Sequence, residues 1–136
     1  MKKILSVLLL VAIILGVIGY YFTQRDYRND IKYQKADEEI SARDLYAAFE
    51  VDEEKANNRF LGKTLLVEGV VQSIERVGDA TTIKLDTGDP LGSIVCEMNT
   101  ELQVDFGHVN EGQSVAIKGE CSGKLLDIIL VNSVIN

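Results

Sequence analysis

The chain has 136 residues, of which 46% are hydrophobic and 26% are charged, and its formal net charge is −7. This length allows one domain with an appendage, and this composition excludes wholesale disorder. Residues 36–136 carry 8 basic and 19 acidic side chains, and the resulting balance of −11 opposes the binding of a polyanion such as nucleic acid.

An apolar run of 19 residues extends from Ile4 to Phe22. As a helix it would be about 28 Å long, close to the ~30 Å hydrocarbon core of a bilayer. Tyr20, Tyr21 and Phe22 close the run, where aromatic residues favour the membrane interface. We therefore expect residues 1–23 to form an uncleaved transmembrane helix, and a removed signal peptide is the alternative.

Basic residues on both sides of this run bear on its orientation. Lys2 and Lys3 favour an N-terminus inside the cell, whereas four basic residues between Arg25 and Lys35 argue weakly for the reverse. The favoured arrangement is an inner-membrane anchor with the domain outside the cytoplasm. Cleavage of the segment would instead leave a periplasmic or secreted protein.

Residues 24–40 are polar and predict a spacer between the membrane and a domain of residues 41–136. The spacing of Ser41 and Asp44 resembles a capping box, so a helix is expected over residues 42–50. Asp52 can cap a second short helix over residues 53–60, which Gly62 would end.

The hydrophobic period changes to two beyond these helices. The stretch of residues 62–75 predicts one long strand that Gly69 bends or bulges. Shorter alternating segments predict four more strands, at residues 81–86, 93–98, 114–121 and 125–135, with a tight hairpin loop at 122–124 and a helical turn around 102–106. The pattern predicts a mainly β fold, a five-stranded OB-fold barrel preceded by short helices and the N-terminal transmembrane helix.

Several segments together resemble a known family. These are residues 40–46, the step from 61–63 into 67–71, Val95-Cys96, residues 115–123, and Asp127 to Leu130. They are similar to the bacterial tRNA anticodon-like OB-fold family, whose small members often carry an N-terminal signal or anchor. The resemblance covers residues 36–136 and implies a fold, because its shared residues are glycines and strand positions rather than chemical groups.

Cys96 and Cys121 are the two cysteines of the chain. Both alternate with apolar neighbours, so they are expected to face the core, either as reduced thiols or as a disulfide outside the cytoplasm. Two cysteines and the single His108 do not supply the four ligands of a zinc site. No motif for a cofactor or for an enzymatic nucleophile is present, so no enzyme, metal or cofactor is expected.

The candidate ligand-binding residues are the outward positions of the second and third predicted strands. They are Thr82, Lys84, Asp86, Val95 and Glu97. These two strands contain no aromatic residue, although OB domains that bind nucleic acid stack bases on aromatic rings and follow the backbone with basic side chains. Nucleic acid is therefore disfavoured as a partner.

The sequence as a whole predicts a non-enzymatic, membrane-tethered OB-fold binding module of the bacterial cell envelope. Its partner, besides the membrane, would be a protein, a peptide or a small ligand. One alternative is a protein that binds single-stranded nucleic acid. Another is an exported, stress-related OB protein that binds cations or cationic peptides. The sequence specifies neither the ligand nor an oligomeric state.

Overall fold

The computed structural model describes residues 1–27, 31–102 and 106–136, apart from the side chains of residues 2–6, 8 and 21–27. Residues 1–30 and residues 31–136 form two separate compact units. The part of the expected helical turn at residues 103–105 lies outside the described residues.

The described part of the first unit is helix α1 (Lys2–Tyr27), which contains the whole predicted apolar run. Among the residues that the structure describes, no helix meets the combined requirements of length and hydropathy for crossing a membrane. The expected aromatic belt includes Tyr21 and Phe22, whose side chains lie outside the described residues.

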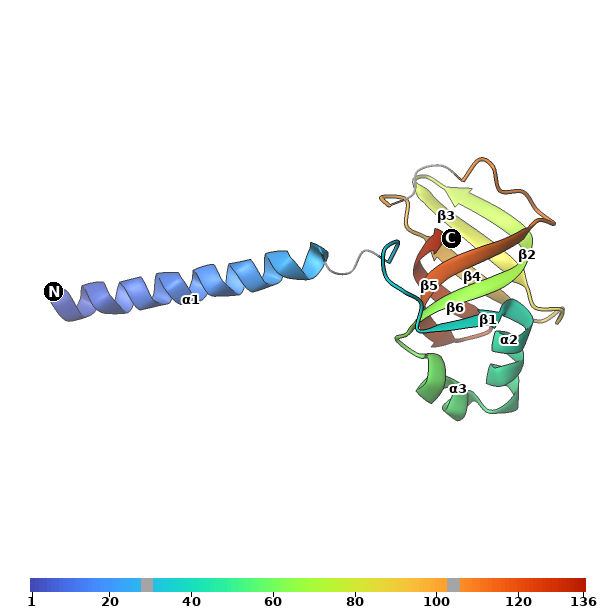
Figure 1. The fold of residues 1–136 in the computed structure, drawn as a ribbon, viewed down its shortest axis with the longest axis horizontal. Coiled ribbons are helices and arrows are strands. Elements are labelled where there is room, and N and C mark those ends of the chain that lie inside the picture. Colours follow the sequence, from blue (N-terminus) through green and yellow to red (C-terminus); the bar gives the residue numbers. More distant parts are fainter. Residues whose placement is uncertain (28–30, 103–105) are drawn as a thin grey trace. The chain divides into compact units, whose positions relative to one another are not determined.

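The second unit contains six strands and two helices within its described residues. In chain order they are β1 (Glu38–Ser41), α2 (Ala42–Val51), α3 (Glu53–Phe60), β2 (Thr64–Val77), β3 (Ala80–Asp86), β4 (Ser93–Met98), β5 (Ser114–Lys124) and β6 (Ile128–Ile135). The strands pair in the order β2, β3, β4, β6 and β5, and β5 pairs back onto β2. The mainly β prediction and the five-stranded barrel are therefore confirmed (Figure 1).

The two predicted helices form where their capping residues stand. Ser41 Oγ accepts a hydrogen bond of 3.0 Å from the Asp44 amide, and Asp52 Oδ1 accepts one of 3.0 Å from the Lys55 amide. Each cap satisfies a backbone donor that the first turn leaves without a helical partner. Figure 1 shows both helices at one end of the barrel.

Gly69 has a different role from the one the sequence suggests. The register of β2 against β3 shifts between Val71 and Ser73, so the bulge lies beyond Gly69. A Cβ at Gly69 would lie 2.9 Å from the Ala42 Cβ, which means that the glycine allows the start of α2 to approach the strand closely. The bulge also explains why Ile74 packs against the core, although simple alternation placed it on the face opposite Val71.

Two further elements differ from the sequence-based prediction. Residues of the expected spacer form β1, which pairs in parallel with the first half of β2. The tight hairpin loop predicted at residues 122–124 is wrong, because β5 continues to Lys124 and β6 begins at Ile128. The turn therefore consists of residues 125–127, and this places two leucines at its tip.

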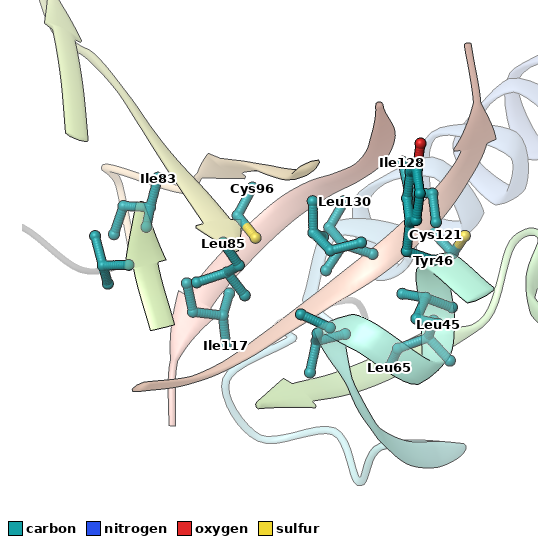
Figure 2. Close-up of a cluster of buried hydrophobic side chains, with 14 of the residues drawn as sticks. Leu45, Tyr46, Leu65, Ile83, Leu85, Cys96, Ile117, Cys121, Ile128 and Leu130 are labelled. Carbon is teal, nitrogen blue, oxygen red and sulfur yellow. The ribbon is translucent and has the colours of Figure 1, made fainter. Parts of the chain in front are cut away.

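The barrel interior is filled by apolar side chains from all five strands. Those with at most 1% of their surface exposed are Leu65, Val67, Val71, Ile83, Leu85, Ile94, Cys96, Ile117, Cys121, Ile128 and Leu130. Figure 2 shows several of them converging with Leu45 and Tyr46 of α2. Phe49 and Phe60 stack with ring centroids 6.1 Å apart and belong to the same core.

A short strap, residues 31–37, is fixed to the barrel ahead of β1. Its first residue, Ile31, is buried, and the Lys118 ammonium donates hydrogen bonds of 3.1 and 2.9 Å to the carbonyl oxygens of Lys32 and Gln34. Asp37 exchanges two hydrogen bonds with Thr64, one from its amide and one to its carboxylate. The buried charge of Lys118 is therefore compensated by backbone oxygens, as a buried cation requires.

A bulge in β6 lets the last strand fit both of its neighbours. Residues 96–98 of β4 lie opposite residues 130–133 of β6, and residues 118–120 of β5 lie opposite residues 131–134. Three residues thus face four on each side, and the extra residue is Asn132, whose φ is +52°. The Asn132 side-chain oxygen accepts a hydrogen bond from the Asn99 amide group. Beside the bulge, Gly119 of β5 lies against the buried Ser133.

We predict that Gly119→Ala lowers the free energy of unfolding by about 1–3 kcal/mol, because its Cβ would overpack this site. The new Cβ would lie 2.4 Å from the Ser133 hydroxyl oxygen and 3.0 Å from the Leu130 Cβ. Chemical denaturation of the full chain measures the loss. The double variant Gly119→Ala with Ser133→Ala should lose less stability than the sum of the losses of the two single variants, because the Ser133 hydroxyl that the new Cβ would meet is then absent. A Gly119→Ala chain as stable as the parent would contradict this packing.

Candidate functional site

The five predicted candidate residues lie side by side on the outside of the barrel. Thr82 of β3 is opposite Glu97 of β4, and Lys84 is opposite Val95. Asp86 follows at the end of β3, opposite the first residue of β4. Two neighbouring carboxylates, Glu75 of β2 and Asp127 of the β5–β6 turn, adjoin this surface. We call the whole surface the outer wall, and its members are Glu75, Thr82, Lys84, Asp86, Val95, Glu97 and Asp127.

The single ammonium group of the outer wall is already paired. Lys84 Nζ lies 2.8 Å from Glu75 Oε1, on the adjoining strand β2. The hydrogen bond and the charge of Glu75 raise the pKa of Lys84, so the side chain stays protonated. Both groups are partly exposed, so this pair contributes little to stability, but it leaves Lys84 less available to a ligand phosphate.

Asp127 is a member of the outer wall that the sequence did not identify. Its Oδ1 atom accepts hydrogen bonds of 2.7 Å from the Ser93 amide and 2.9 Å from the Ser93 hydroxyl. This contact fastens the β5–β6 turn to the start of β4. In the sequence Asp127 is only a polar interruption of an apolar segment, and nothing there links it to a residue 34 positions away.

The outer wall is acidic and has no ring on which a base could stack. It carries the carboxylates of Glu75, Asp86, Glu97 and Asp127 and the one ammonium of Lys84. The core and the barrel ends bury Tyr46, Phe49, Phe60 and Phe106, and the exposed Tyr33 belongs to the strap. The wall can therefore attract cations and accept hydrogen bonds, but it lacks the features by which OB domains hold single strands.

Two hollows lie at opposite ends of the barrel. One, of about 730 Å³, lies beside the β2–β3 turn and is lined by Arg76, Asp79, Thr81, Thr100, Phe106, Gly107, Val109 and Asn110. The other, of about 590 Å³, lies between α2 and the β3–β4 loop and is lined by Arg43, Tyr46, Ala47, Glu50, Thr87, Gly88, Asp89 and Pro90. Neither hollow contains any of the five predicted candidate residues.

His108 is exposed and does not form a catalytic arrangement with the side chains that the structure describes. Its backbone oxygen accepts a hydrogen bond from Asn110, and no nucleophilic side chain among the described residues bonds to its ring. Among the residues that the structure describes, no three His, Cys, Asp or Glu side chains lie close enough together to hold a metal ion.

The two cysteines are buried as free thiols. Cys96 of β4 and Cys121 of β5 both lie opposite Leu130, one on each side of β6. Two strand spacings of about 4.8 Å separate them by roughly 10 Å, whereas the Cα atoms of a disulfide lie no more than about 7 Å apart. The register therefore favours the reduced alternative.

A comparison with known protein families identifies relatives of this chain. The family model described as tRNA_anti-like matches residues 1–135. The chain belongs to the tRNA_anti-like family. This confirms the family resemblance that the strand and glycine positions indicated.

Solved structures extend the comparison of this tRNA_anti-like protein. A lipoprotein from Klebsiella pneumoniae, to which nucleic-acid binding has been attributed, is 18% identical with a TM-score of 0.61, and the match covers 76% of this chain and 99% of that chain. At this identity the likeness shows the fold alone. No curated protein gives a significant match.

Two other solved structures match less closely. The OBody AM3L09, bound to hen egg-white lysozyme, is 18% identical with a TM-score of 0.41, and the match covers 57% of this chain and 84% of that chain. A Leishmania major protein assigned as an aspartyl-tRNA synthetase is 16% identical with a TM-score of 0.48, and the match covers 76% of this chain but 22% of that one.

We predict that a thiol reagent at pH 8 labels neither Cys96 nor Cys121 while the chain is folded. Burial raises the pKa of both thiols above the ordinary value of about 8.5, so the reactive thiolate is scarce and shielded. Mass analysis before and after denaturation checks the result. Asp79→Cys, at an exposed turn position, is the positive control. Rapid labelling of a native thiol, or a mass two hydrogens lower that reduction restores, would contradict the buried thiols.

Proposed function

We propose that this protein is a membrane-tethered, non-enzymatic OB-fold module of the bacterial cell envelope whose ligand is not a nucleic acid. The observation that carries the proposal is the outer wall, where four carboxylates surround one ammonium that Glu75 already holds. An OB barrel presents this face to its ligands, together with the neighbouring loops. A surface of this charge repels phosphates and attracts cationic groups.

Two observations support the tether. The apolar run of 19 residues lies within α1, and the family match begins at residue 1. Both cysteines of this sequence belong to strands of the barrel, so the proposed attachment uses the apolar helix rather than a cysteine. The proposed anchor is therefore the helix itself, with its N-terminus inside and the barrel outside the cytoplasm.

The absence of an enzymatic role is part of the proposal and rests on the composition of the surfaces. The outer wall lacks a nucleophile next to a base, and Ser93 is buried with its hydroxyl bonded to Asp127. The barrel interior is apolar and filled by the described side chains, so a ligand would bind on the outside of the barrel or at its ends, where two hollows lie.

Binding of single-stranded nucleic acid is the competing function, because that activity is attributed to the Klebsiella pneumoniae lipoprotein. We predict that the purified chain does not retain a labelled mixed-sequence oligonucleotide in a low-salt filter assay at concentrations of ~1–100 μM, where non-specific binders do. The reason is the negative charge of the outer wall and its lack of rings.

The matched control for this assay reverses two charges of the outer wall. Asp86→Lys with Glu97→Lys should increase retention, because both positions are exposed and face the same side. Salt-sensitive retention of oligonucleotide by the parent chain, lost when Lys84 is replaced by Glu, would establish the competing function and reject the proposal.

We predict that Asp79→Cys in whole cells reacts with a membrane-impermeant maleimide. Asp79 is exposed at the β2–β3 turn, and unlike Gly78, with a φ of +59°, it does not need the left-handed region. The parent chain, with its two buried thiols, should remain unlabelled and so provides the control. Labelling of the variant only after cell lysis would place the barrel in the cytoplasm.

A further inference from the structure

Two loops meet at the end of the barrel that α2 covers. The first loop is the β3–β4 loop, residues 87–92, and the second is the β5–β6 turn, residues 125–127. Ser93, which follows the first loop at the start of β4, donates two hydrogen bonds to Asp127 of the second. The loops are well separated in the sequence, but this contact holds the end of one loop against the end of the other. The hollow of about 590 Å³ between α2 and the β3–β4 loop adjoins the same place.

The polar side chains of both loops are turned back onto the protein. Lys124 pairs with Glu50 of α2 and lies 5.0 Å above the Tyr46 ring. The Thr87 hydroxyl donates to the Gly92 carbonyl oxygen at 2.6 Å, and Asp89 Oδ1 accepts from the Leu91 amide at 2.8 Å. These contacts give the two loops a defined conformation, so their remaining side chains are presented in fixed positions.

The side chains that remain at the tips are leucines. Leu91, Leu125 and Leu126 are 84%, 83% and 80% exposed, and together they form what we call the leucine surface. Single exposed leucines are common on soluble proteins and need no explanation. Three of them lie on two loops whose ends the Ser93–Asp127 hydrogen bonds hold together. An exposed apolar surface of this kind marks an interaction site.

Carboxylates surround the leucine surface. Asp86 and Asp89 flank the β3–β4 loop, and Asp127 follows Leu126 directly. The ammonium of Lys124 is held by Glu50, which leaves Arg43 as the cation nearest to the hollow. This negative rim disfavours the anionic surface of a bacterial membrane and favours a partner that carries positive charge beside apolar groups.

We propose that the leucine surface and the adjoining hollow form a docking site for a protein segment that combines apolar side chains with lysine or arginine. The apolar side chains of the segment would cover Leu91, Leu125 and Leu126, and its cations would lie against Asp86, Asp89 and Asp127. This inference rests on the proposed function as a binding module, and it assigns the contact to the end of the barrel rather than to the outer wall alone.

The test measures binding of a short peptide of alternating leucine and lysine to the full chain. The chain is captured through a C-terminal tag, since β6 ends at the opposite end of the barrel from the leucine surface. Leu125→Ser with Leu126→Ser should weaken the Kd about tenfold, which corresponds to a loss of about 1.4 kcal/mol of binding free energy. Val77→Ser is the matched control, because Val77 is 77% exposed at the far end of the barrel.

Two further peptides separate the contributions of charge and apolar surface. Serine in place of every leucine should abolish most of the binding, and glutamate in place of every lysine should do the same. Equal affinity of the parent and the double-leucine variant for the leucine–lysine peptide would overturn the proposal. So would equally tight binding of the leucine–glutamate peptide, which would show that the carboxylate rim is irrelevant.

Two other partners could cover the leucine surface, a second copy of the chain or a membrane, and each would give a different result. Concentration-dependent dimerisation of the parent, lost in the double-leucine variant, would assign the surface to a second copy and overturn the proposal. Leucine-dependent binding to vesicles of anionic lipid would assign it to a membrane and also overturn it. Peptide binding lost in Asp86→Lys with Glu97→Lys but kept in the leucine variant would reject this docking site and leave the proposed function standing.

Discussion

The parallel pairing of β4 with β6 is the interaction on which the rest of the structure depends. It joins Ile94 to Ile128 and Cys96 to Leu130, and it turns a sheet of five strands into a closed barrel. Closure removes the two edges that an open sheet would expose to other chains. It also directs the inner face of every strand toward one core, which the apolar side chains fill without needing a ligand.

A filled interior confines any binding to the outside and the ends of the barrel. The outward residues of β3 and β4 then determine what the main face can hold, and their charge is negative. The α2 end adds an apolar element that the main face lacks, because Lys124 and Asp127 bond inward and leave Leu125 and Leu126 outside. The same internal hydrogen bonds that stabilise the loops thus determine which side chains a partner meets.

Local sequence signals predicted the helices and the strands that follow strict alternation. The capping residues Ser41 and Asp52 marked both helix starts, and the alternation in residues 93–98 gave the bounds of β4 directly. The five outward candidates were also predictable, because alternation alone decides which side of a strand faces outward.

Features that depend on pairing between distant segments were not predictable in the same way. The strand β1 forms because β3 pairs with β2 only from Val71 onward, which leaves one side of the first half of β2 open to residues 38–41. The sequence of residues 38–41 does not itself indicate this pairing. The bulge after Val71 and the bulge at Asn132 depend on the register with neighbouring strands. Asp127 and the leucine surface were missed for the same reason, since their roles follow from which loops meet at one end of the barrel.

Closure of the barrel can be measured directly by hydrogen exchange of the backbone amides in β4 and β6. A closed barrel predicts slow exchange for amides on both sides of each strand, comparable to those between β2 and β3, because every side has a partner. Fast exchange of the amides through which β4 and β6 face each other would show two open edges. That result would contradict the closed barrel and, with it, the assignment of binding to the outer surfaces.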